Sequence, residues 1–309
     1  MKIRTATQWI KQFLQQDPPR AKSVVMTVFG DAITPHGGAV WLGSLIALLA
    51  PLGISERLVR TSVFRLADEG WLEATRSGRR SQYRLTAQGQ QRFNRAHQRI
   101  YSPAPAAWDG RWTVLMTAPE LQSSALRSAL KKELLWEGFG QFAAGVYAHP
   151  GNKDEALSEV LARTGTAGHV VVLSAVEKTS VTSRPLEHLL AQCWALDKLI
   201  DDTTGFIACF APLQTLLAKQ NAIEPQEAFV IRTLLIHAFR RVQLHDPQLP
   251  AALLPADWQG TTAYALCRAL YQRTSAQADA HVTTTLSMEQ GALPPLSASY
   301  AQRFGGVSV

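Results

Sequence analysis

Residues 54–86 read ISERLVRTSVFRLADEGWLEATRSGRRSQYRLT, and this stretch decides the fold of the N-terminal part of the chain. Its first half has the three- and four-residue spacing of a helix with one buried face, at Leu58, Val59, Ser62, Val63 and Leu66. Ser55 is expected to cap this helix with its hydroxyl, and Gly70 to end it. Residues 71–76 and 82–86 then alternate as two strands around a Ser-Gly-Arg-Arg turn. The stretch therefore predicts a helix followed directly by a β-hairpin.

Basic side chains line the other side of both elements. An α-helix fits the major groove of B-DNA, and a guanidinium group offers paired donors to guanine as well as charge to phosphates. We therefore expect a DNA-binding helix whose Arg57, Arg60 and Thr61 lie nearest the bases. The candidate DNA-binding residues are Ser55, Arg57, Arg60, Thr61, Arg65, Arg76, Arg79 and Arg80, the last four on phosphates or in the adjacent minor groove. The alternative is a solvated face whose arginines pair with Glu56, Asp68 or Glu69.

The charge of the chain is unevenly distributed. Residues 1–99 hold 15 Lys and Arg against 6 Asp and Glu, whereas the rest of the chain holds 16 against 18. A net charge of +9 in the first third predicts a polyanionic partner for that part alone. Double-stranded DNA fits better than a membrane surface, because the chain shows no lipidation motif and no strongly basic amphipathic helix. Binding by charge alone, without regard to base sequence, is a further alternative.

The remaining composition predicts a cytoplasmic protein. The longest apolar stretch, residues 39–52, is interrupted by Gly43, Ser44 and Pro51, and it is shorter than the about 20 residues that cross a bilayer. The first residues lack an apolar segment followed by a cleavage site, so we expect no export signal. Three widely spaced cysteines, Cys193, Cys209 and Cys267, indicate reduced thiols without a disulfide or a zinc site.

Proline-rich connectors divide the chain into segments. A short leading helix is expected before Pro18 and Pro19. Two further helices, at 20–30 and 41–49, precede the Ser55 helix, so residues 20–100 are expected to form a winged helix-turn-helix domain. Strand, helix, strand, helix and strand patterns follow between residues 108 and 178 and favour a ferredoxin-like α+β domain. The second of these strands is expected at 139–149, with a break at Gly145. Helical periodicity predicts an α-helical C-terminal domain at 184–275, whose first helix is expected at 186–200. Residues 276–309 are expected to be a tail, loose over its last twenty or so residues, which are rich in Ser, Thr, Gly and Pro. The predicted fold class is therefore α+β with several domains.

Several long strings along the chain have a familiar order. In the first part they are PRAKSVVMTVFGD at 19–31, PHGG at 35–38, WLGSLI at 41–46 and residues 54–66. Later ones are EGWL at 69–72, GRRSQY at 78–83, WDGRW at 108–112, HDPQLP at 245–250 and LLPADW at 253–258. Together they resemble the PaaX-type repressors of phenylacetic acid degradation. The resemblance implies a GntR-like winged helix, a middle domain similar to the Cas2 fold and an α-helical C-terminal domain. It also implies a homodimer that binds an operator and represses phenylacetate catabolic genes until phenylacetyl-CoA binds.

A coenzyme A thioester would need basic groups for its phosphates and an apolar slot for its acyl group. The C-terminal half offers Arg184, Arg240, Arg241, His245, Asp246 and Trp258 as candidate effector-binding residues. The alternative is structural, because His245-Asp246-Pro247 is also typical of a turn in which Asp accepts backbone N–H groups.

The sequence does not indicate an enzyme. A metal-dependent nuclease needs converging carboxylates, and Asp109 has no obvious partner near the first middle strand. Cys193 has no identifiable base, and the chain lacks G-x-S-x-G and H-E-x-x-H motifs. We therefore expect no catalytic residues, no metal and no cofactor, and we keep an acyl-CoA-binding enzyme or a metal-dependent nuclease as the alternative function.

Overall fold

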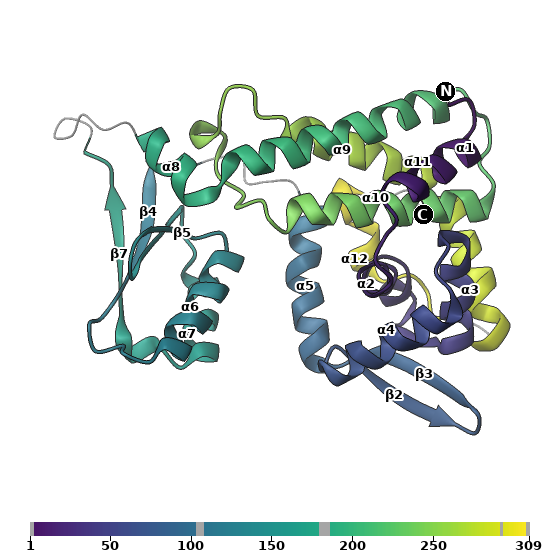
Figure 1. Cartoon of the computed structure of the whole chain (residues 1–309), viewed down its shortest axis with the longest axis horizontal. Coiled ribbons are helices and arrows are strands. Elements are labelled where there is room, and N and C mark those ends of the chain that lie inside the picture. The colour runs from purple at the N-terminus through teal and green to yellow at the C-terminus, as the bar shows by residue number, and fades with distance from the viewer. Residues whose placement is uncertain (1–2, 103–107, 179–185, 291–292, 307–309) are drawn as a thin grey trace. The chain divides into compact units, whose positions relative to one another are not determined.

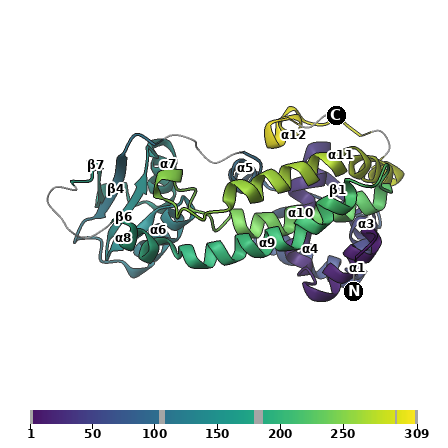
Figure 2. The same cartoon turned by 90° about the horizontal axis from the view of Figure 1, so that it is seen from above.

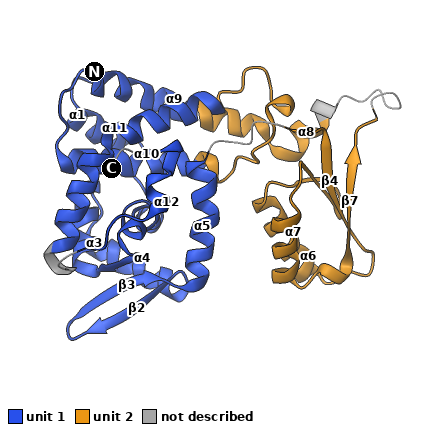
Figure 3. Cartoon of the chain, turned by 180° about the vertical axis from the view of Figure 1, so that it is seen from behind, with its two compact units in different colours: residues 1–103, 205–241, 260–309 blue, residues 104–204, 242–259 orange. Residues whose placement is uncertain are grey.

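The structure is a computed structural model, and it describes residues 3–102, 108–178, 186–290 and 293–306 (Figure 1). The chain forms two compact units, which Figure 3 distinguishes by colour. Unit 1 holds residues 1–103, 205–241 and 260–309, and unit 2 holds residues 104–204 and 242–259. Among the described helices, none combines the length and apolar character that crossing a membrane requires. Each unit combines segments that are far apart in the sequence. The domain boundaries expected from the sequence therefore stay predictions.

The N-terminal part of unit 1 contains five α-helices and a three-stranded antiparallel sheet of order β1-β3-β2. The helices are α1 (Ala6–Gln16), α2 (Ala21–Val28), α3 (Leu42–Leu49), α4 (Glu56–Asp68) and α5 (Ala87–Tyr101). The strands are β1 (Ala39–Trp41), β2 (Leu72–Ser77) and β3 (Arg80–Leu85). Figure 1 shows the β2–β3 hairpin projecting from this unit beside α4. The predicted order of three helices and a hairpin is present.

Two elements of this part were not predicted from the sequence. Strand β1 has three residues, too few for an alternating pattern to be recognised in the sequence. It is defined instead by its pairing with β3, in which Val40 lies opposite Tyr83. Helix α5 begins after Thr86, whose hydroxyl accepts from the N–H of Gly89 at 2.9 Å and donates to the carbonyl of Gly70 at 2.7 Å. Thr86 thereby fixes the end of the hairpin to the start of the helix.

The C-terminal part of unit 1 is helical. Helices α9 (Leu196–Leu217), α10 (Pro225–Gln243), α11 (Gly260–Gln290) and α12 (Ala298–Ala301) follow one another along the chain, with α9 in unit 1 from Gly205 on. Figures 1 and 2 show α9, α10 and α11 running alongside one another. The helix predicted at 186–200 is divided at Ala195, whose positive φ of 44° ends α8 (Leu186–Trp194) before α9 begins.

The expectation of a loose tail is wrong for the described residues of that segment. Helix α11 is 31 residues long and continues far into it. Tyr300, Arg303 and Phe304 are exposed by 2% or less, and Phe304 packs against Tyr271 with ring centroids 5.1 Å apart. The Ser, Gly and Pro content suggested a loose end, but a few large side chains in it bury enough surface to hold it in the core.

A buried charge cluster joins the two parts of unit 1. Asp31 follows α2, and its carboxylate lies 3.0 Å from Arg232 Nε of α10 and 3.0 Å from Arg303 Nη1 near the C-terminus. The side chains of these three residues are 2%, 0% and 2% exposed. Arg232 also pairs with Asp279 of α11 at 2.6 Å, and Tyr271 donates to Asp31 at 2.9 Å. Two arginines and two aspartates therefore balance their charges in the interior, as buried ions require.

Unit 2 has a ferredoxin-like topology. Its elements are β4 (Arg111–Thr117), α6 (Ser124–Trp136), β5 (Gly140–Ala143), β6 (Val146–Pro150), α7 (Asp154–Thr164), β7 (Val170–Val176) and α8. The strands form an antiparallel sheet of order β5-β6-β4-β7. The single strand predicted at 139–149 is wrong, because the chain reverses at Gly145, with φ of 74°, into the β5–β6 hairpin. The sequence read this glycine as a break within one strand, and it is the turn between two.

The core of unit 2 lies between one sheet face and its helices. Leu115 and Tyr147 of the sheet pack with Leu130, Leu134 and Val160 of α6 and α7. Trp112 and Ala148 on the opposite face pack with Leu190 and Trp194 of α8. The edge strand β7 instead leaves apolar side chains in solvent, namely Val171, Val172, Leu173 and Val176.

Candidate nucleic-acid interface

Helix α4 begins where the sequence predicts but without the expected cap. Ser55 occupies the N-cap position with extended backbone angles, and its side chain makes no capping hydrogen bond. The capping role expected for the Ser55 hydroxyl is therefore wrong in this structure. Glu56 lies in the first turn, where a negative charge favours the helix dipole, and it pairs with Arg60 at 2.7 Å.

The two faces of α4 differ as the periodicity predicts, with one exception. Val59, Ser62, Val63 and Leu66 are buried, whereas Leu58 is 50% exposed. Arg57, Arg60, Thr61 and Arg65 are exposed on the other side. Leu58 is thus not part of the buried face of α4, which packs against α2 and α3 through the other four residues. The basic face of α4 lies in solvent and is open to a large partner.

The β2–β3 hairpin presents a second set of arginines. Ser77 pairs with Arg80 across a two-residue loop in which Gly78 has a φ of 60°. Glycine at the first central position of such a loop is typical of a type II′ turn. The side chains of Arg76, Arg79 and Arg80 are exposed, and the guanidinium of Arg80 lies 4.7 Å from the ring centre of Trp41. The Trp41 ring thus positions Arg80 by a cation–π contact.

Few of these arginines form ion pairs among the described residues. Arg60 pairs with Glu56, whereas Arg57, Arg65, Arg76, Arg79 and Arg80 form no ion pair with any residue that the structure describes. Glu69, one of the expected intramolecular partners, pairs with Lys22 at 2.5 Å instead. The alternative that these arginines are neutralised by ion pairs within the chain therefore applies, among the described residues, to Arg60 alone.

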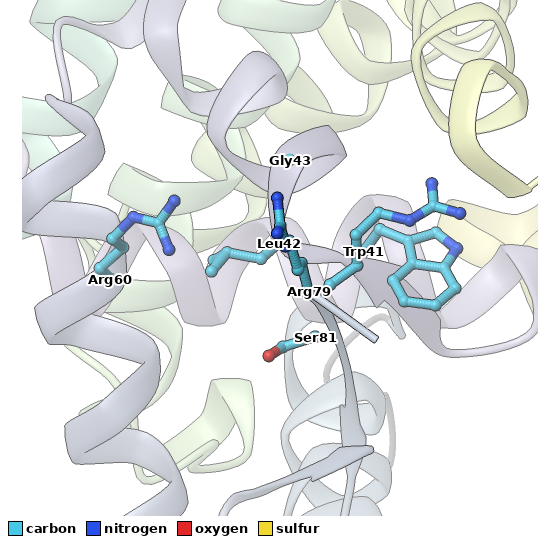
Figure 4. A pocket seen from close by; sticks show the side chains of 7 residues that line it. Trp41, Leu42, Gly43, Arg60, Arg79 and Ser81 are labelled. Atoms are coloured by element: carbon cyan, nitrogen blue, oxygen red, sulfur yellow. The ribbon is translucent and has the colours of Figure 1, made fainter. Parts of the chain in front are cut away.

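A small pocket brings the two sets of arginines together. It has a volume of about 200 Å³ and is lined by Trp41, Leu42, Gly43, Arg60, Arg79, Arg80 and Ser81. In Figure 4 Arg60 enters from α4 on one side, Trp41 lies on the other, and Arg79 comes from the hairpin between them. Residues from three separate stretches of sequence meet there, because β1 pairs with β3 and leads straight into α3.

The chemistry of this pocket favours a phosphate group. Three arginine side chains, those of Arg60, Arg79 and Arg80, line the pocket, and Arg60 alone among them pairs with a described carboxylate, that of Glu56. The first N–H groups of a helix have no intrahelical acceptor, and at the start of α3 Trp41 makes no side-chain cap. Free N–H groups at a helix N-terminus and arginines both bind phosphate oxygens. Trp41 and Gly43 were not predicted as site residues, since neither is charged and only the fold brings them beside the arginines.

The candidate effector residues are divided between the two units of the chain. Arg184 lies outside the described residues. Arg240 is largely buried and donates to Thr27 Oγ1 at 3.2 Å, and burial lowers the pKa of its guanidinium. Arg241, 59% exposed, pairs with Asp17 at 2.9 Å. Both belong to unit 1, whereas His245, Asp246 and Trp258 belong to unit 2.

Asp246 has the local role that the alternative reading gives it. Its Oδ1 accepts from the backbone N–H of Gln248 at 2.7 Å, which is an Asx-turn. His245 is exposed and Trp258 is half-buried. The effector-binding role of these residues stays a prediction. In the described part of the chain, no group of three His, Cys, Asp or Glu side chains is placed to hold a metal ion.

Comparisons with known proteins cover nearly the whole chain. The family model described as PaaX-like protein matches residues 20–89, the PaaX protein central Cas2-like domain matches 105–186, and the PaaX-like protein C-terminal domain matches 194–284. The transcriptional repressor PaaX of Escherichia coli (strain K12) is 39% identical over 302 residues, which cover 97% of this chain and 95% of that protein.

A solved structure extends the likeness to three dimensions. The uncharacterized protein Rv0674 from Mycobacterium tuberculosis matches with a TM-score of 0.52 and 27% identity, covering 83% of this chain and 98% of that one. The predicted α+β class, with a Cas2-like central domain and a helical C-terminal part, is confirmed by the family match and by the helices and strands described above.

Proposed function

The chain belongs to the PaaX-like protein family, and from this premise we propose that it is a transcriptional repressor that binds operator DNA through α4 and the β2–β3 hairpin. The observation that carries the proposal is that Arg60, Arg79 and Arg80 line one pocket, next to the exposed basic face of α4. The N-terminal part then acts as a winged helix, with α4 in the major groove and the hairpin as its wing.

The arginines divide between two tasks in this proposal. Arg57, Arg60 and Thr61 face base edges from the first two turns of α4, where a recognition helix makes its base contacts. Arg65 and the hairpin arginines bind phosphates, and Arg79 and Arg80 hold one phosphodiester of the backbone at the pocket, which Arg60 borders on the side of the bases. The phosphate contacts supply affinity and register, whereas the base contacts supply discrimination between sequences.

The family and the resemblance of the sequence support a regulated homodimer. We propose that phenylacetyl-CoA binds the part of the chain beyond the DNA-binding domain, releases the operator of phenylacetate catabolic genes in the cytoplasm, and does so by shifting the population between two states. A dimer presents two α4 helices to half-sites about one helical turn, or a multiple of it, apart. The exposed valines of the edge strand β7 support self-association, because an edge strand offers unpaired backbone groups and these side chains add apolar surface.

A gel-shift experiment tests the proposal. The purified protein is mixed with the duplex upstream of its coding sequence at two salt concentrations, with phenylacetyl-CoA, with free phenylacetate or with neither. We expect specific binding that weakens at higher salt and is lost with the thioester but not with the free acid. Specific binding that ignores the thioester would remove the effector from the proposal. Absence of a specific shift, together with thioester turnover or metal-dependent cleavage of the DNA, would favour an enzyme instead.

A further inference from the structure

Phe64 is exposed in the middle of α4 and does not contribute to the buried core. Its side chain is 71% exposed, more than any other large apolar side chain among the described residues. Val59, Val63 and Leu66 already close the buried face of the helix at 1% exposure or less. A phenylalanine in water forgoes the stabilisation that burial would provide, so the conformation of α4 alone does not account for this residue.

Phe64 lies on the stripe of α4 that carries the proposed base-reading residues. Arg57, Thr61 and Phe64 are spaced at i, i+4 and i+7, which places them one above another on a helix surface. All three are exposed, and Leu58, the other exposed apolar residue of α4, lies about 120° away around the helix axis, at 100° per residue. The ring is therefore part of the same surface as the arginines.

The surroundings of Phe64 decide what it faces. Arg57, Arg60 and Arg65 lie around it on the exposed side of α4, with one carboxylate, that of Asp68, a turn beyond it, and the first third of the chain carries a net charge of +9. A second copy of this surface would bring like charges together, which disfavours self-association through it. Duplex DNA offers the opposite charge, and in its major groove the 5-methyl group of thymine is the apolar feature among the base edges.

We propose that Phe64 reads thymine, with its ring against the 5-methyl group in the major groove. The inference rests on the proposed DNA-binding function and adds a specificity-determining residue to it. Seven residues separate Phe64 from Arg57, about 10 Å along the helix at a rise of 1.5 Å per residue. At 3.4 Å per base-pair step, the thymine lies about three base pairs from the one that Arg57 contacts when the helix follows the groove.

Replacing thymine with deoxyuridine removes only the methyl group and tests this contact directly. The full-length protein first selects its preferred duplex from a random pool, and each thymine in that duplex is then replaced in turn. For the unaltered protein we expect about fourfold weaker binding at one thymine per half-site, the factor that corresponds to one buried methyl group. Phe64→Ala should bind the thymine duplex more weakly and lose nothing further on the deoxyuridine replacement.

Leu58→Ala is the matched control, because it removes a similar exposed apolar side chain from another stripe of the same helix. It should keep the full deoxyuridine effect. If Phe64→Ala also keeps it, the inference fails while the repressor function stands. A changed sedimentation coefficient for Phe64→Ala with an unchanged deoxyuridine profile would assign the residue to an interface between copies and overturn the inference. If no sequence is enriched from the pool, the proposed function fails and the inference with it.

Discussion

Replacing Arg303 with Met removes a buried charge from the core of unit 1. Arg303 Nη1 donates to the backbone carbonyl of Asp31 at 2.9 Å and to its Oδ1 at 3.0 Å, and Nη2 donates to the carbonyl of Gly30 at 2.9 Å. The guanidinium also lies 4.3 Å from the ring centre of Tyr101. Methionine fills a similar length of space but donates no hydrogen bond. The substitution therefore leaves Asp31 with one arginine partner. It also removes a donor from the buried carbonyl of Asp31 and from the partly buried carbonyl of Gly30.

The expected loss of stability follows from these contacts. Breaking a buried ion pair by removing one partner destabilises a protein by about 3–5 kcal/mol. Arg232 remains 3.0 Å from Asp31 and compensates part of the loss, so we expect about 3 kcal/mol. For a domain of 150–250 residues, 1 kcal/mol lowers the Tm by about 2–4 °C, so the transition should fall by roughly 6–12 °C.

Circular dichroism during heating measures the effect, with Arg241→Met as the control. Arg241 also pairs with an aspartate at 2.9 Å, but both side chains are about 60% exposed, and such a pair contributes about 1 kcal/mol or less. Equal shifts of the Tm in the two variants would refute the reasoning. They would mean that desolvation of Arg303 cancels its attraction to Asp31, and that the C-terminal segment is held by its apolar contacts alone.

The remaining predictions concern the interface, the helix caps and pH. Arg79→Ala should weaken DNA binding equally for all sequences and reduce the salt slope of log Kobs by about 1, and an unchanged slope in a salt titration would show that Arg79 does not contact a phosphate. Thr86→Ala should lose about 1 kcal/mol of unfolding free energy in urea, whereas Ser55→Ala should change it little because Ser55 makes no capping bond; equal losses would contradict the cap assignment. Burial and then Arg240 and Arg241 lower the pKa of His237 from 6.5 to about 4, so the unfolded state binds the proton more tightly between these values. The contribution of His237 to the free energy of unfolding should therefore be fully present above pH 6.5 and decrease as the pH falls toward 4. His237→Asn should show a smaller drop in Tm than the unaltered protein between pH 7 and pH 5.

The local elements of the DNA-binding part could be predicted from the sequence because their signals are local. The spacing of Val59, Val63 and Leu66 defines the buried face of α4, and the Ser-Gly-Arg-Arg turn defines the hairpin. The excess of positive charge needs only a count of residues. Each signal extends over a few helical turns or one strand pair, so neighbouring residues are sufficient to carry it.

Helix ends and turns were less predictable, because several conformations compete for the same short sequence. Ser55 stands at an N-cap without using its hydroxyl, and Gly145 reverses the chain where a break in one strand was expected. The fate of the Leu58 side chain depended on whether α2 and α3 left room for it. These outcomes depend on contacts that the local pattern does not contain.

By itself, the sequence determined the class of fold, the basic helix and hairpin, and the likeness to PaaX-type repressors. Only the tertiary structure brought Trp41 and Gly43 beside Arg60 and Arg79 in one pocket, left Phe64 in solvent, and buried Arg303 against Asp31 at a separation of 272 residues. The physical reason is that periodicity and charge are properties of adjacent residues. A pocket or a buried ion pair depends instead on which distant segments the fold packs together, and on which charges that packing removes from water.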